Sequence, residues 1–338
     1  MNSTVKNTDL EAKIFAARGQ NFLPTVLEVF AFQYEHNAVY RQFCQLIGRH
    51  PGTVGNLLQL PFMPISFFKT HPISTTDFTP AMVFESSGTT QSTTSRHAVK
   101  DLYLYETSFV KAFEKVYGPA QNWCILGLLP SYLERGQSSL VWMVDQLIEK
   151  SGHPLSGFYL YDFDQLHKTL LHNEILQQPT LLIGVTYALL DFAAAYPMQL
   201  QHTTLMETGG MKGRRTELTR QEVHEQLRQL LGVSQVHAEY GMTELLSQAY
   251  ATADGLFHCP PWMRVLLRSE DDPFALTAHL NPQQAAATGA INIIDLANLY
   301  SCSFIATDDS GKLHADGSFE VLGRLDNSDI RGCSLLAV

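Results

Sequence analysis

"TLLIGVTYALLDFAAAYPMQLQHTTLMETGG", residues 180–210, holds two short apolar runs with a longer apolar segment between them. Residues 180–185 and 203–210 have the length and composition of strands, whereas residues 186–197 have the length of a helix. Two strands that are joined by a helix form a parallel pair, because a parallel connection needs a long crossover. The stretch therefore predicts one unit of an α/β sheet.

The same alternation of short strands and helices extends to both sides of this unit. Further predicted elements lie at residues 122–130, 138–152, 158–162, 163–176, 218–232 and 234–241. Thr219 and Glu222 have the spacing of a capping box at the start of the last of these helices. The alternation predicts an α/β fold, a mainly parallel sheet with helices on both faces.

We assign this α/β core to residues 81–250. The pattern of predicted helices and strands differs on either side of it. Residues 1–80 look mostly helical. Residues 251–338 contain short apolar runs and turns without long helices, at 264–270, 289–296, 301–309 and 318–326. We expect one domain over residues 1–338, with a helical N-terminal part, an α/β core, and a β-rich subdomain that ends in a hinge-like C-terminus.

The bulk composition excludes several classes of protein. The chain has 338 residues, 45% of them hydrophobic, and a formal net charge of −10, which predicts no nucleic-acid partner. The N-terminus lacks the layout of a signal peptide, and no apolar run is long enough for a membrane span. The five cysteines are scattered and form no CxxC pair, which favours a reduced, cytoplasmic compartment.

Three polar loops follow predicted strands: "ESSGTTQSTTSRH" (85–97), "METGGMKGRR" (206–215) and "EYGMTE" (239–244). The first loop follows the apolar run 81–84 and precedes a predicted helix with Asp101 as its cap. In open α/β sheets, ligands bind at the carboxyl ends of the strands. We therefore expect all three loops to face one crevice.

The residue types in these loops suit a nucleotide with its phosphates and Mg²⁺. The first loop offers hydroxyls and a glycine that can surround phosphate oxygens: Ser87, Gly88, Thr89 and Thr90. The second offers glycines for an adenine face and cations for anionic oxygens: Gly209, Gly210, Lys212, Arg214 and Arg215. The third offers an aromatic ring, a glycine, a hydroxyl and a carboxylate for Mg²⁺: Tyr240, Gly241, Thr243 and Glu244. Taken singly, each loop is better explained as a linker, a glycine turn or an ordinary strand end; their shared order after strands favours one site.

Four motifs in this order resemble the adenylate-forming superfamily of acyl-CoA synthetases and luciferases: "SSGTT", "EYGMTE", "TDD" and "GRLDNSDIRG". Within that superfamily the chain is most similar to acyl-protein synthetases of the LuxE type, through segments such as "PFMPISFFKTH", "PSYLERGQSSLVWMV" and "GCSLL". The resemblance spans nearly the whole chain. It implies the fold of the large N-terminal domain of these enzymes without their small C-terminal domain.

The resemblance also implies a two-step reaction with ATP and Mg²⁺. A carboxylate attacks the α-phosphate of ATP to form an acyl-adenylate and pyrophosphate, and a nucleophile then takes the acyl group. The implied roles are phosphate binding by Ser87, Gly88, Thr89 and Thr90, adenine contact by Tyr240, α-phosphate contact by Thr243, Mg²⁺ binding by Glu244, ribose binding by Asp309, and ribose or phosphate contact by Arg324.

The chain departs from the superfamily pattern in the first polar loop and near its C-terminus. Gln91 stands where a glycine usually follows "SSGTT", and the lysine that normally ends this loop is missing, with Arg96 or Lys100 as substitutes. The chain also ends soon after "GRLDNSDIRG", before the domain that usually carries a catalytic lysine. Lys69 or Lys212 then supplies the positive charge, or adenylation is slow, or the protein is not a catalyst.

Cys333 stands near the C-terminus, where LuxE-type proteins have a cysteine that takes the acyl group from the adenylate. A thiolate is a good acyl acceptor, but a small apolar residue in a final strand is an equally good interpretation. His97 and Asp101 form an H-x-x-x-D pair, a spacing that some acyltransferases use, without the flanking residues usual there.

The sequence is compatible with three functions. The first is an acyl-protein synthetase that activates a fatty acid and passes it to a protein cysteine, with an acyl reductase or acyl-carrier protein as partner. The second is a CoA ligase of the phenylacetate type, acting on another carboxylic acid. The third is a nucleotide- or acyl-binding subunit without catalysis that serves a reductase or transferase.

Overall fold

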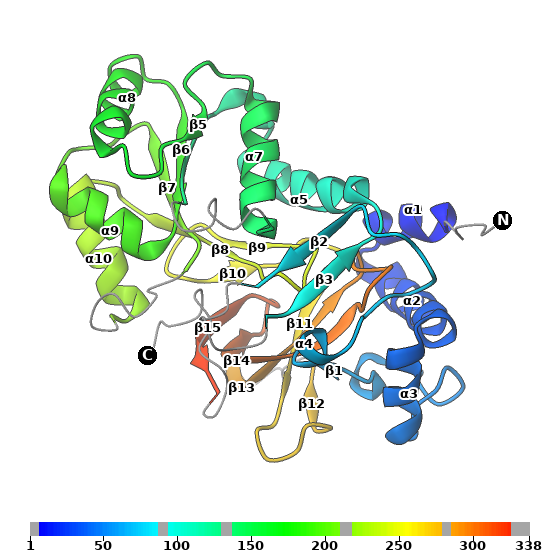
Figure 1. Cartoon of the computed structure of the whole chain (residues 1–338). Coiled ribbons are helices and arrows are strands. Elements are labelled where there is room, and N and C mark those ends of the chain that lie inside the picture. The colour runs from blue at the N-terminus through cyan, green and yellow to red at the C-terminus, as the bar shows by residue number, and fades with distance from the viewer. Residues whose placement is uncertain (1–6, 87–93, 130–136, 210–217, 279–284, 326–338) are drawn as a thin grey trace.

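The computed structural model describes residues 7–86, 94–129, 137–209, 218–278 and 285–325. These residues form a 13-stranded sheet, a separate two-stranded sheet, and helices that pack around them (Figure 1). Among the described residues, no helix is long and apolar enough to cross a membrane.

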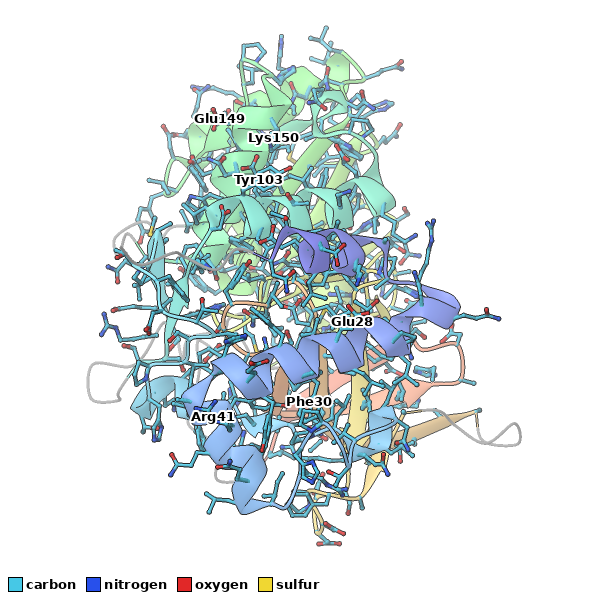
Figure 2. All side chains as sticks on the ribbon, turned by 90° about the vertical axis from the view of Figure 1, so that its right-hand side faces the viewer. Glu28, Phe30, Arg41, Tyr103, Glu149 and Lys150 are labelled. Atoms are coloured by element: carbon cyan, nitrogen blue, oxygen red, sulfur yellow. The ribbon has the colours of Figure 1, made fainter. Side chains whose placement is uncertain are left out.

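Helices dominate the N-terminal part. They are α1 (Thr8–Ala16), α2 (Phe22–His36), α3 (Ala38–Leu46) and α4 (Phe67–Thr70), with 3₁₀ turns at Gly19–Asn21 and Leu57–Gln59. On the outside of α2, Glu28 accepts a hydrogen bond of 2.8 Å from Lys13 of α1 (Figure 2). Phe30, on the same helix, is buried, and its ring packs edge-on against Phe304 at 6.1 Å. The N-terminal helices are thus anchored by an aromatic contact to the C-terminal half of the chain.

The middle of the chain forms the predicted α/β core. Its strands are β4 (Cys124–Leu128), β5 (Gly157–Phe158), β6 (Thr180–Gly184), β7 (Thr203–Glu207) and β8 (Val236–Tyr240). Its helices are α5 (Leu102–Tyr117), preceding a 3₁₀ turn at Ala120–Asn122, then α7 (Ser139–Ser151), α8 (Phe163–Ile175), α9 (Thr186–Ala195) and α10 (Arg220–Leu231). The strands pair in parallel in the order β5-β4-β6-β7-β8. Helices α5 and α7 lie on one side of them and α8, α9 and α10 on the other (Figure 1).

Burial explains why these strands have continuous apolar sequences. Every residue of β4 and β6 is buried, as expected for parallel strands that helices cover on both faces. The predicted helix over residues 186–197 is α9, and the predicted capping box is present at the start of α10. The α/β interpretation of the sequence is therefore confirmed.

The C-terminal part is β-rich and continues the same sheet. Its strands are β9 (Ala249–Ala251), β10 (Phe257–His258), β11 (Met263–Arg268), β12 (Leu276–Thr277), β13 (Ala286–Asp295), β14 (Phe304–His314) and β15 (Phe319–Arg324). They pair antiparallel in the order β9-β10-β15-β14-β13-β11-β12, and β9 pairs antiparallel with β8. A short strand from the N-terminal part, β1 (Met63–Pro64), pairs in parallel with β14. The register of β14 and β15 sets Asp309 opposite Arg324.

The first polar loop has a different setting from the predicted one. We expected residues 85–97 to lie between a strand and a helix. In the structure β2 (Met82–Glu85) pairs antiparallel with a second strand, β3 (Arg96–Val99), and this two-stranded sheet is separate from the large one. The β-hairpin was missed because the four-residue strand β3 is too short for a clear alternation of apolar and polar residues.

The capping box of α10 gives a prediction about stability. Thr219 Oγ1 accepts a hydrogen bond of 3.2 Å from the backbone N–H of Glu222, whose carboxylate accepts one of 2.7 Å from the backbone N–H of Thr219. We expect Thr219→Ala to lower the free energy of unfolding by about 1 kcal/mol, measured by urea denaturation. In a double-mutant cycle with Glu222→Ala, the two losses should sum to more than that of the double variant. Strict additivity would contradict a reciprocal cap.

Candidate active site

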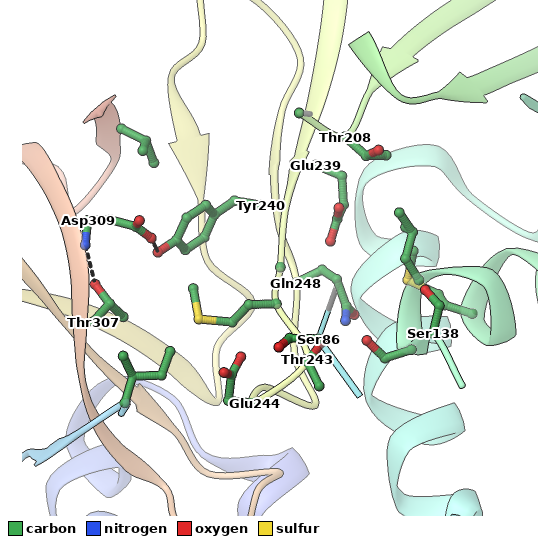
Figure 3. Close-up of a pocket in the computed structure, with 18 of the residues that line it drawn as sticks. Ser86, Ser138, Thr208, Glu239, Tyr240, Thr243, Glu244, Gln248, Thr307 and Asp309 are labelled. Atoms are coloured by element: carbon green, nitrogen blue, oxygen red, sulfur yellow. Dashed lines mark hydrogen bonds between the residues drawn. The ribbon is translucent and has the colours of Figure 1, made fainter. Parts of the chain in front are cut away.

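A cavity lies at the carboxyl ends of β7 and β8, the place where ligands bind in open α/β sheets (Figure 3). β7 and β8 are parallel neighbours, so their ends open on the same edge. The cavity is lined by residues 85–86, 138–140, 207–209, 239–244 and 307–309, and by Arg324, among others. The described parts of all three polar loops therefore meet at one cavity.

One side of the cavity is built around Tyr240 and Asp309. The Tyr240 hydroxyl donates a hydrogen bond of 2.8 Å to the Asp309 carboxylate, and the Asp309 backbone N–H donates one of 3.2 Å to Thr307 Oγ1 (Figure 3). The Tyr240 ring packs edge-on against Phe319 at 5.4 Å. Burial and the charge of Asp309 raise the pKa of the Tyr240 hydroxyl well above its usual range. Tyr240 therefore stays a neutral donor that fixes the orientation of Asp309.

The turn that follows β8 carries Thr243 and Glu244, and buried side chains hold its backbone from behind. His97 Nδ1 lies 2.7 Å from the Thr243 carbonyl oxygen and donates a hydrogen bond to it. Asn298 Nδ2 donates one of 2.7 Å to the Glu244 carbonyl oxygen. Burial lowers the pKa of His97, although the bond to Thr243 acts in the opposite direction. The Glu244 side chain lines the cavity and is fully buried.

Asp295 fixes the end of the same turn. Its carboxylate accepts hydrogen bonds from the backbone N–H groups of Leu246 (2.8 Å) and Ser247 (3.0 Å) and from the Ser247 hydroxyl (2.5 Å). Burial raises the pKa of Asp295, while these hydrogen bonds counteract the shift. The backbone around Glu244 is thus set by three buried partners from two distant segments, which gives a rigid site.

The H-x-x-x-D pair has a structural explanation. His97 is buried on β3 and holds the turn after β8, whereas Asp101 caps α5 by accepting a hydrogen bond of 2.9 Å from the Tyr103 backbone N–H. Neither residue lines the large cavity. The two side chains therefore have separate roles, in a turn and in a helix cap.

The basic residues that were predicted for the site lie in different places in the structure. Arg324 lines the cavity and donates a hydrogen bond of 3.1 Å to Asp308. Arg96 pairs with Glu85 at 3.2 Å, at the start of the first loop. Lys100 lies over the ring of Tyr300, 4.0 Å from its centre, and neither it nor Lys69, on α4, lines the large cavity.

The remaining predicted site residues divide between the cavity and the undescribed segments. Gly209, Tyr240, Gly241, Thr243, Glu244 and Asp309 line the cavity. Outside the described residues lie Ser87, Gly88, Thr89, Thr90, Gly210, Lys212 and Cys333, together with Gln91, Arg214 and Arg215.

The residues on the second side of the cavity are not among those that the sequence predicted. There Figure 3 shows Glu239, Gln248, Ser86 and Ser138, across from Tyr240 and Asp309. Glu239 directly precedes Tyr240, and its carboxylate lies over Gly241, where a Cβ atom would come within 2.3 Å of it. The signal for Glu239 was its position beside Tyr240 at the end of a buried strand, while nothing in the sequence indicated Gln248.

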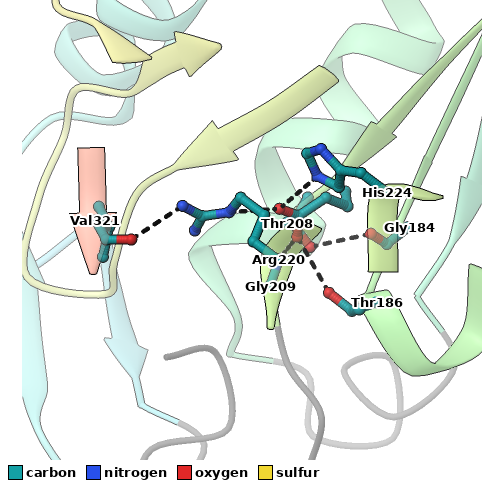
Figure 4. Close-up of polar contacts among 8 residues, drawn as sticks. Gly184, Thr186, Thr208, Gly209, Arg220, His224 and Val321 are labelled. Carbon is teal, nitrogen blue, oxygen red and sulfur yellow. Dashed lines mark hydrogen bonds and ion pairs between the residues drawn. The ribbon is translucent and has the colours of Figure 1, made fainter. Parts of the chain in front are cut away.

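Glu207, the last residue of β7, is the centre of a second missed group. Its partners Thr186, Gly209, Arg220 and His224 are labelled in Figure 4. Its carboxylate accepts hydrogen bonds from the Thr186 hydroxyl (3.1 Å) and the Gly209 backbone N–H (2.6 Å). The same carboxylate lies 3.4 Å from Arg220 Nε and 3.6 Å from His224 Nε2. Burial alone would raise the pKa of Glu207, but His224 and Arg220 outweigh it and bring the pKa to about 2. Glu207 is therefore a buried anion that holds the start of the second polar loop.

Arg220 extends this group to β15. Its Nη1 atom donates a hydrogen bond of 3.1 Å to the Val321 carbonyl oxygen, and its guanidinium lies over the Phe257 ring, 5.3 Å from the ring centre. Phe257 and Val321 also line the cavity. Arg220 thus ties the α/β core to the antiparallel strands at the cavity wall.

Comparisons with known proteins identify the fold. No protein family and no curated protein sequence matches the chain. The chain is similar to the crystal structure of 2-hydroxyisobutyryl-CoA ligase in the postadenylation state in complex with R3-HIB-AMP, with a TM-score of 0.60 and 12% identity. That similarity covers 98% of this chain and 74% of the ligase chain.

Two further structures have lower scores. One is a long-chain-fatty-acid-CoA ligase from Archaeoglobus fulgidus, with a TM-score of 0.49, 13% identity, and coverage of 73% of this chain and 52% of that one. The other is the O-succinylbenzoate coenzyme A synthetase of Bacillus subtilis in complex with ATP and magnesium. Its TM-score is 0.44 at 15% identity, and the similarity covers 73% of this chain and 50% of that one. The chain thus spans about half the length of these two proteins.

The fold is that of the large N-terminal domain of adenylate-forming enzymes. This conclusion rests on the alignment of nearly the whole chain with 2-hydroxyisobutyryl-CoA ligase. The sequence-based expectation of this fold is confirmed.

Proposed function

We propose that the protein activates a carboxylic acid with ATP, forming an acyl-adenylate. The observation that carries the proposal is the meeting of Tyr240, Asp309 and Glu244 at one cavity, at the carboxyl ends of the strands. A buried carboxylate beside an aromatic ring suits a ribose with its base, and a second buried carboxylate suits a metal that accompanies phosphates. An apolar lining would suit neither.

The residues divide into two groups of proposed contacts. Asp309, which Tyr240 orients, accepts hydrogen bonds from the ribose hydroxyls, and the Tyr240 ring and Gly209 lie against the adenine. Thr243 contacts the α-phosphate, and Arg324 contacts the ribose or a phosphate. The first loop is proposed to bind phosphates through Ser87, Gly88, Thr89 and Thr90.

Glu244 is the proposed Mg²⁺ ligand. Among the described residues, no group of three or more His, Cys, Asp or Glu side chains is arranged to hold a metal ion. A single carboxylate fits Mg²⁺ nevertheless, because this ion is often held by one or two carboxylates together with substrate phosphates. When bound, Mg²⁺ neutralises charge on the phosphates.

The proposed chemistry is an exchange at the α-phosphorus. A carboxylate oxygen of the acid forms a bond to the α-phosphorus while the bond from that phosphorus to the bridging oxygen breaks, and pyrophosphate leaves. In a second step a thiolate attacks the acyl carbon, the bond to AMP breaks, and a thioester forms. The protein contributes mainly by holding the two substrates in line for the first step.

The LuxE-type resemblance adds finer proposals. The acid is a fatty acid, the thiol is that of Cys333, and an acyl reductase or acyl-carrier protein receives the product. The four cysteines among the described residues are free thiols, in keeping with the reduced, cytoplasmic setting that these steps need. Lys212 and Lys69 were the candidates for the catalytic cation, and Lys69 now has less support because it lies outside the lining of the cavity.

ATP–pyrophosphate exchange with a panel of carboxylic acids tests the proposal. We expect exchange that depends on both an acid and Mg²⁺. The heat-unfolded protein is the control. Binding of ATP without exchange for any acid would instead favour a non-catalytic binding subunit. Adding CoA to an active mixture distinguishes a CoA ligase, which releases free acyl-CoA, from an acyl-protein synthetase.

Labelling of the protein itself tests the acceptor. With ATP, Mg²⁺ and a radiolabelled acid that supports exchange, we expect a thioester that neutral hydroxylamine releases. Cys333→Ser should remove this label and leave exchange nearly unchanged, because the first step needs no thiol. Label that survives in Cys333→Ser and maps to Cys259 would refute this acceptor and leave the activation step intact.

A further inference from the structure

We propose that the second side of the cavity binds an ammonium group, so that the acid activated by this protein carries an amine. The residues that carry the inference are Glu239 and Gln248. The inference rests on the proposed adenylation for the position of the carboxylate and narrows its substrate class. It departs from the unsubstituted fatty acid that the LuxE-type resemblance implies.

Glu239 faces the cavity without a protein partner. Its side chain lines the cavity from the end of β8, and the described residues offer it neither a hydrogen bond nor an ion pair. Burial and the neighbouring charge of Glu207 raise the pKa of Glu239 to about 8. No cationic side chain of the described residues offsets these two effects. A carboxyl in this setting gains from a cationic ligand and gains nothing from a hydrocarbon chain.

The basic side chains near the neighbouring Glu207 are already engaged. Arg220 and His224 lie within ion-pair distance of Glu207, and Arg220 also donates to the Val321 carbonyl oxygen. The negative charge of Glu207 is thereby balanced by basic side chains, whereas no basic side chain of the described residues pairs with Glu239. The imbalance is specific to the carboxyl that lies beside Tyr240 at the end of β8.

Gln248 is a second, independent acceptor on the same side. The residue is 3% exposed, it lines the cavity, and its buried Oε1 atom accepts no hydrogen bond from the described residues. A buried amide oxygen without a donor is costly, so its presence at a cavity points to a donor supplied by a ligand.

The other polar groups nearby have donors or acceptors within the protein. Ser86 Oγ accepts a hydrogen bond of 2.9 Å from the Ser95 backbone N–H. Ser138 Oγ accepts one of 3.4 Å from the Val141 backbone N–H, and the Tyr105 hydroxyl donates one of 3.0 Å to the Ser139 carbonyl oxygen. Among the described residues on this side of the cavity, Glu239 and Gln248 therefore keep acceptor atoms for a ligand.

These two acceptors fit an ammonium group better than a hydroxyl. An ammonium group has three donors and a positive charge, so it can serve both acceptors and balance the carboxylate. A hydroxyl has one donor and no charge. Leu140 and Met143 line the same side and give it an apolar part that suits a hydrocarbon portion of the acid.

Matched pairs of acids test the inference in the full chain. We would compare exchange with L-leucine against 4-methylpentanoate, and with L-phenylalanine against 3-phenylpropanoate. The corresponding 2-hydroxy acids, octanoate and dodecanoate complete the panel. We expect an amino acid of the panel to exceed its deamino counterpart in kcat/KM by about a hundredfold or more, because a site built for a donor rejects an analogue that lacks it. Faster exchange with octanoate or dodecanoate would overturn the inference while supporting adenylation.

Two variants assign the effect to the site. Glu239→Gln removes the charge at nearly constant size, and Gln248→Met removes the acceptor at similar volume. We expect Glu239→Gln to lower kcat/KM for the amine-bearing acid by about ten- to a hundredfold and to leave AMP affinity unchanged. Glu149→Gln, an exposed change on α7, is the matched control and should have no effect. An unchanged preference in folded Glu239→Gln and Gln248→Met would overturn the inference.

Calorimetric titration of the same acids without ATP separates this inference from the proposed function. Binding of an amine-bearing acid that Glu239→Gln weakens would support the inference even if no exchange occurred. Tighter binding of a 2-hydroxy acid or of a deamino acid would overturn it, as would the absence of any binding by the amino acids. Absence of exchange together with absence of AMP binding would contradict adenylation instead.

Discussion

Glu244→Gln is expected to lower acid-dependent ATP–pyrophosphate exchange by about 10²- to 10³-fold while the protein stays folded. Glu244 is fully buried at the cavity, and the amide that replaces its carboxylate cannot balance the charge of Mg²⁺. The fold should survive because the backbone of the turn is held through the Glu244 carbonyl oxygen by Asn298 and through Thr243 by His97. Neither contact involves the Glu244 carboxylate.

The measurement is the exchange rate as a function of Mg²⁺ concentration. We expect the loss to be partly recovered at high Mg²⁺ if Glu244 acts on metal affinity, and Glu149→Gln should behave as the unchanged protein. Unfolding midpoints of both variants check the fold. A folded Glu244→Gln protein with the full exchange rate at every Mg²⁺ concentration would exclude Glu244 from the reaction.

The sequence was informative where one local pattern decides a structure. Short apolar strands alternating with helices predicted the parallel core, and the spacing of Thr219 and Glu222 predicted a helix start. The rule that ligands bind at the carboxyl ends of parallel strands predicted that the three polar loops share one cavity, whereas the place of Asp309 beside Tyr240, 69 residues away, was implied only by the family resemblance. Such rules act through topology, which the order of elements reveals.

Individual side-chain contacts between distant segments could not be predicted from the sequence. His97 looked like one half of a catalytic motif, yet its ring holds the Thr243 carbonyl oxygen, 146 residues away. Gln248 lies in an apolar stretch that gave no reason to consider it. The charge state of Glu239 depends on Glu207 from a neighbouring strand and on burial, and neither can be read from local spacing.

The two neighbouring carboxyl groups of the cavity illustrate how partners decide a role. Glu207 and Glu239 stand at the ends of the adjacent strands β7 and β8. Burial raises both pKa values, but His224 and Arg220 outweigh it at Glu207, whereas the charge of Glu207 adds to it at Glu239, so the two pKa values move in opposite directions. Identical residue types at equivalent strand ends thus become a structural anion and a candidate ligand-binding group.

Glu207→Gln is the second substitution for which we expect a large effect, here on stability. It leaves Arg220 and His224 beside a neutral amide, and removing one partner of a buried ion pair costs about 3–5 kcal/mol. We therefore expect a loss of that size in the free energy of unfolding near pH 7, measured by urea denaturation. The hydrogen bond from the Gly209 N–H should persist, because an amide oxygen still accepts it.

The pH dependence of this loss distinguishes a charge effect from a packing effect. The pKa of Glu207 falls from an ordinary value of 4.5 to about 2 on folding, so its charge stabilises the fold fully above the unfolded pKa. The contribution, about 3 kcal/mol, declines as the pH falls from the unfolded pKa toward the folded one. The difference in unfolding free energy between the unchanged protein and Glu207→Gln should accordingly be constant from pH 7 to about pH 5.5 and shrink below that, because the variant has no carboxyl to protonate. A difference that persists unchanged at pH 4 and below would mean that the substitution acts through packing around Thr186 and Gly209, and the ionised Glu207 would then have no special part in holding the cavity wall.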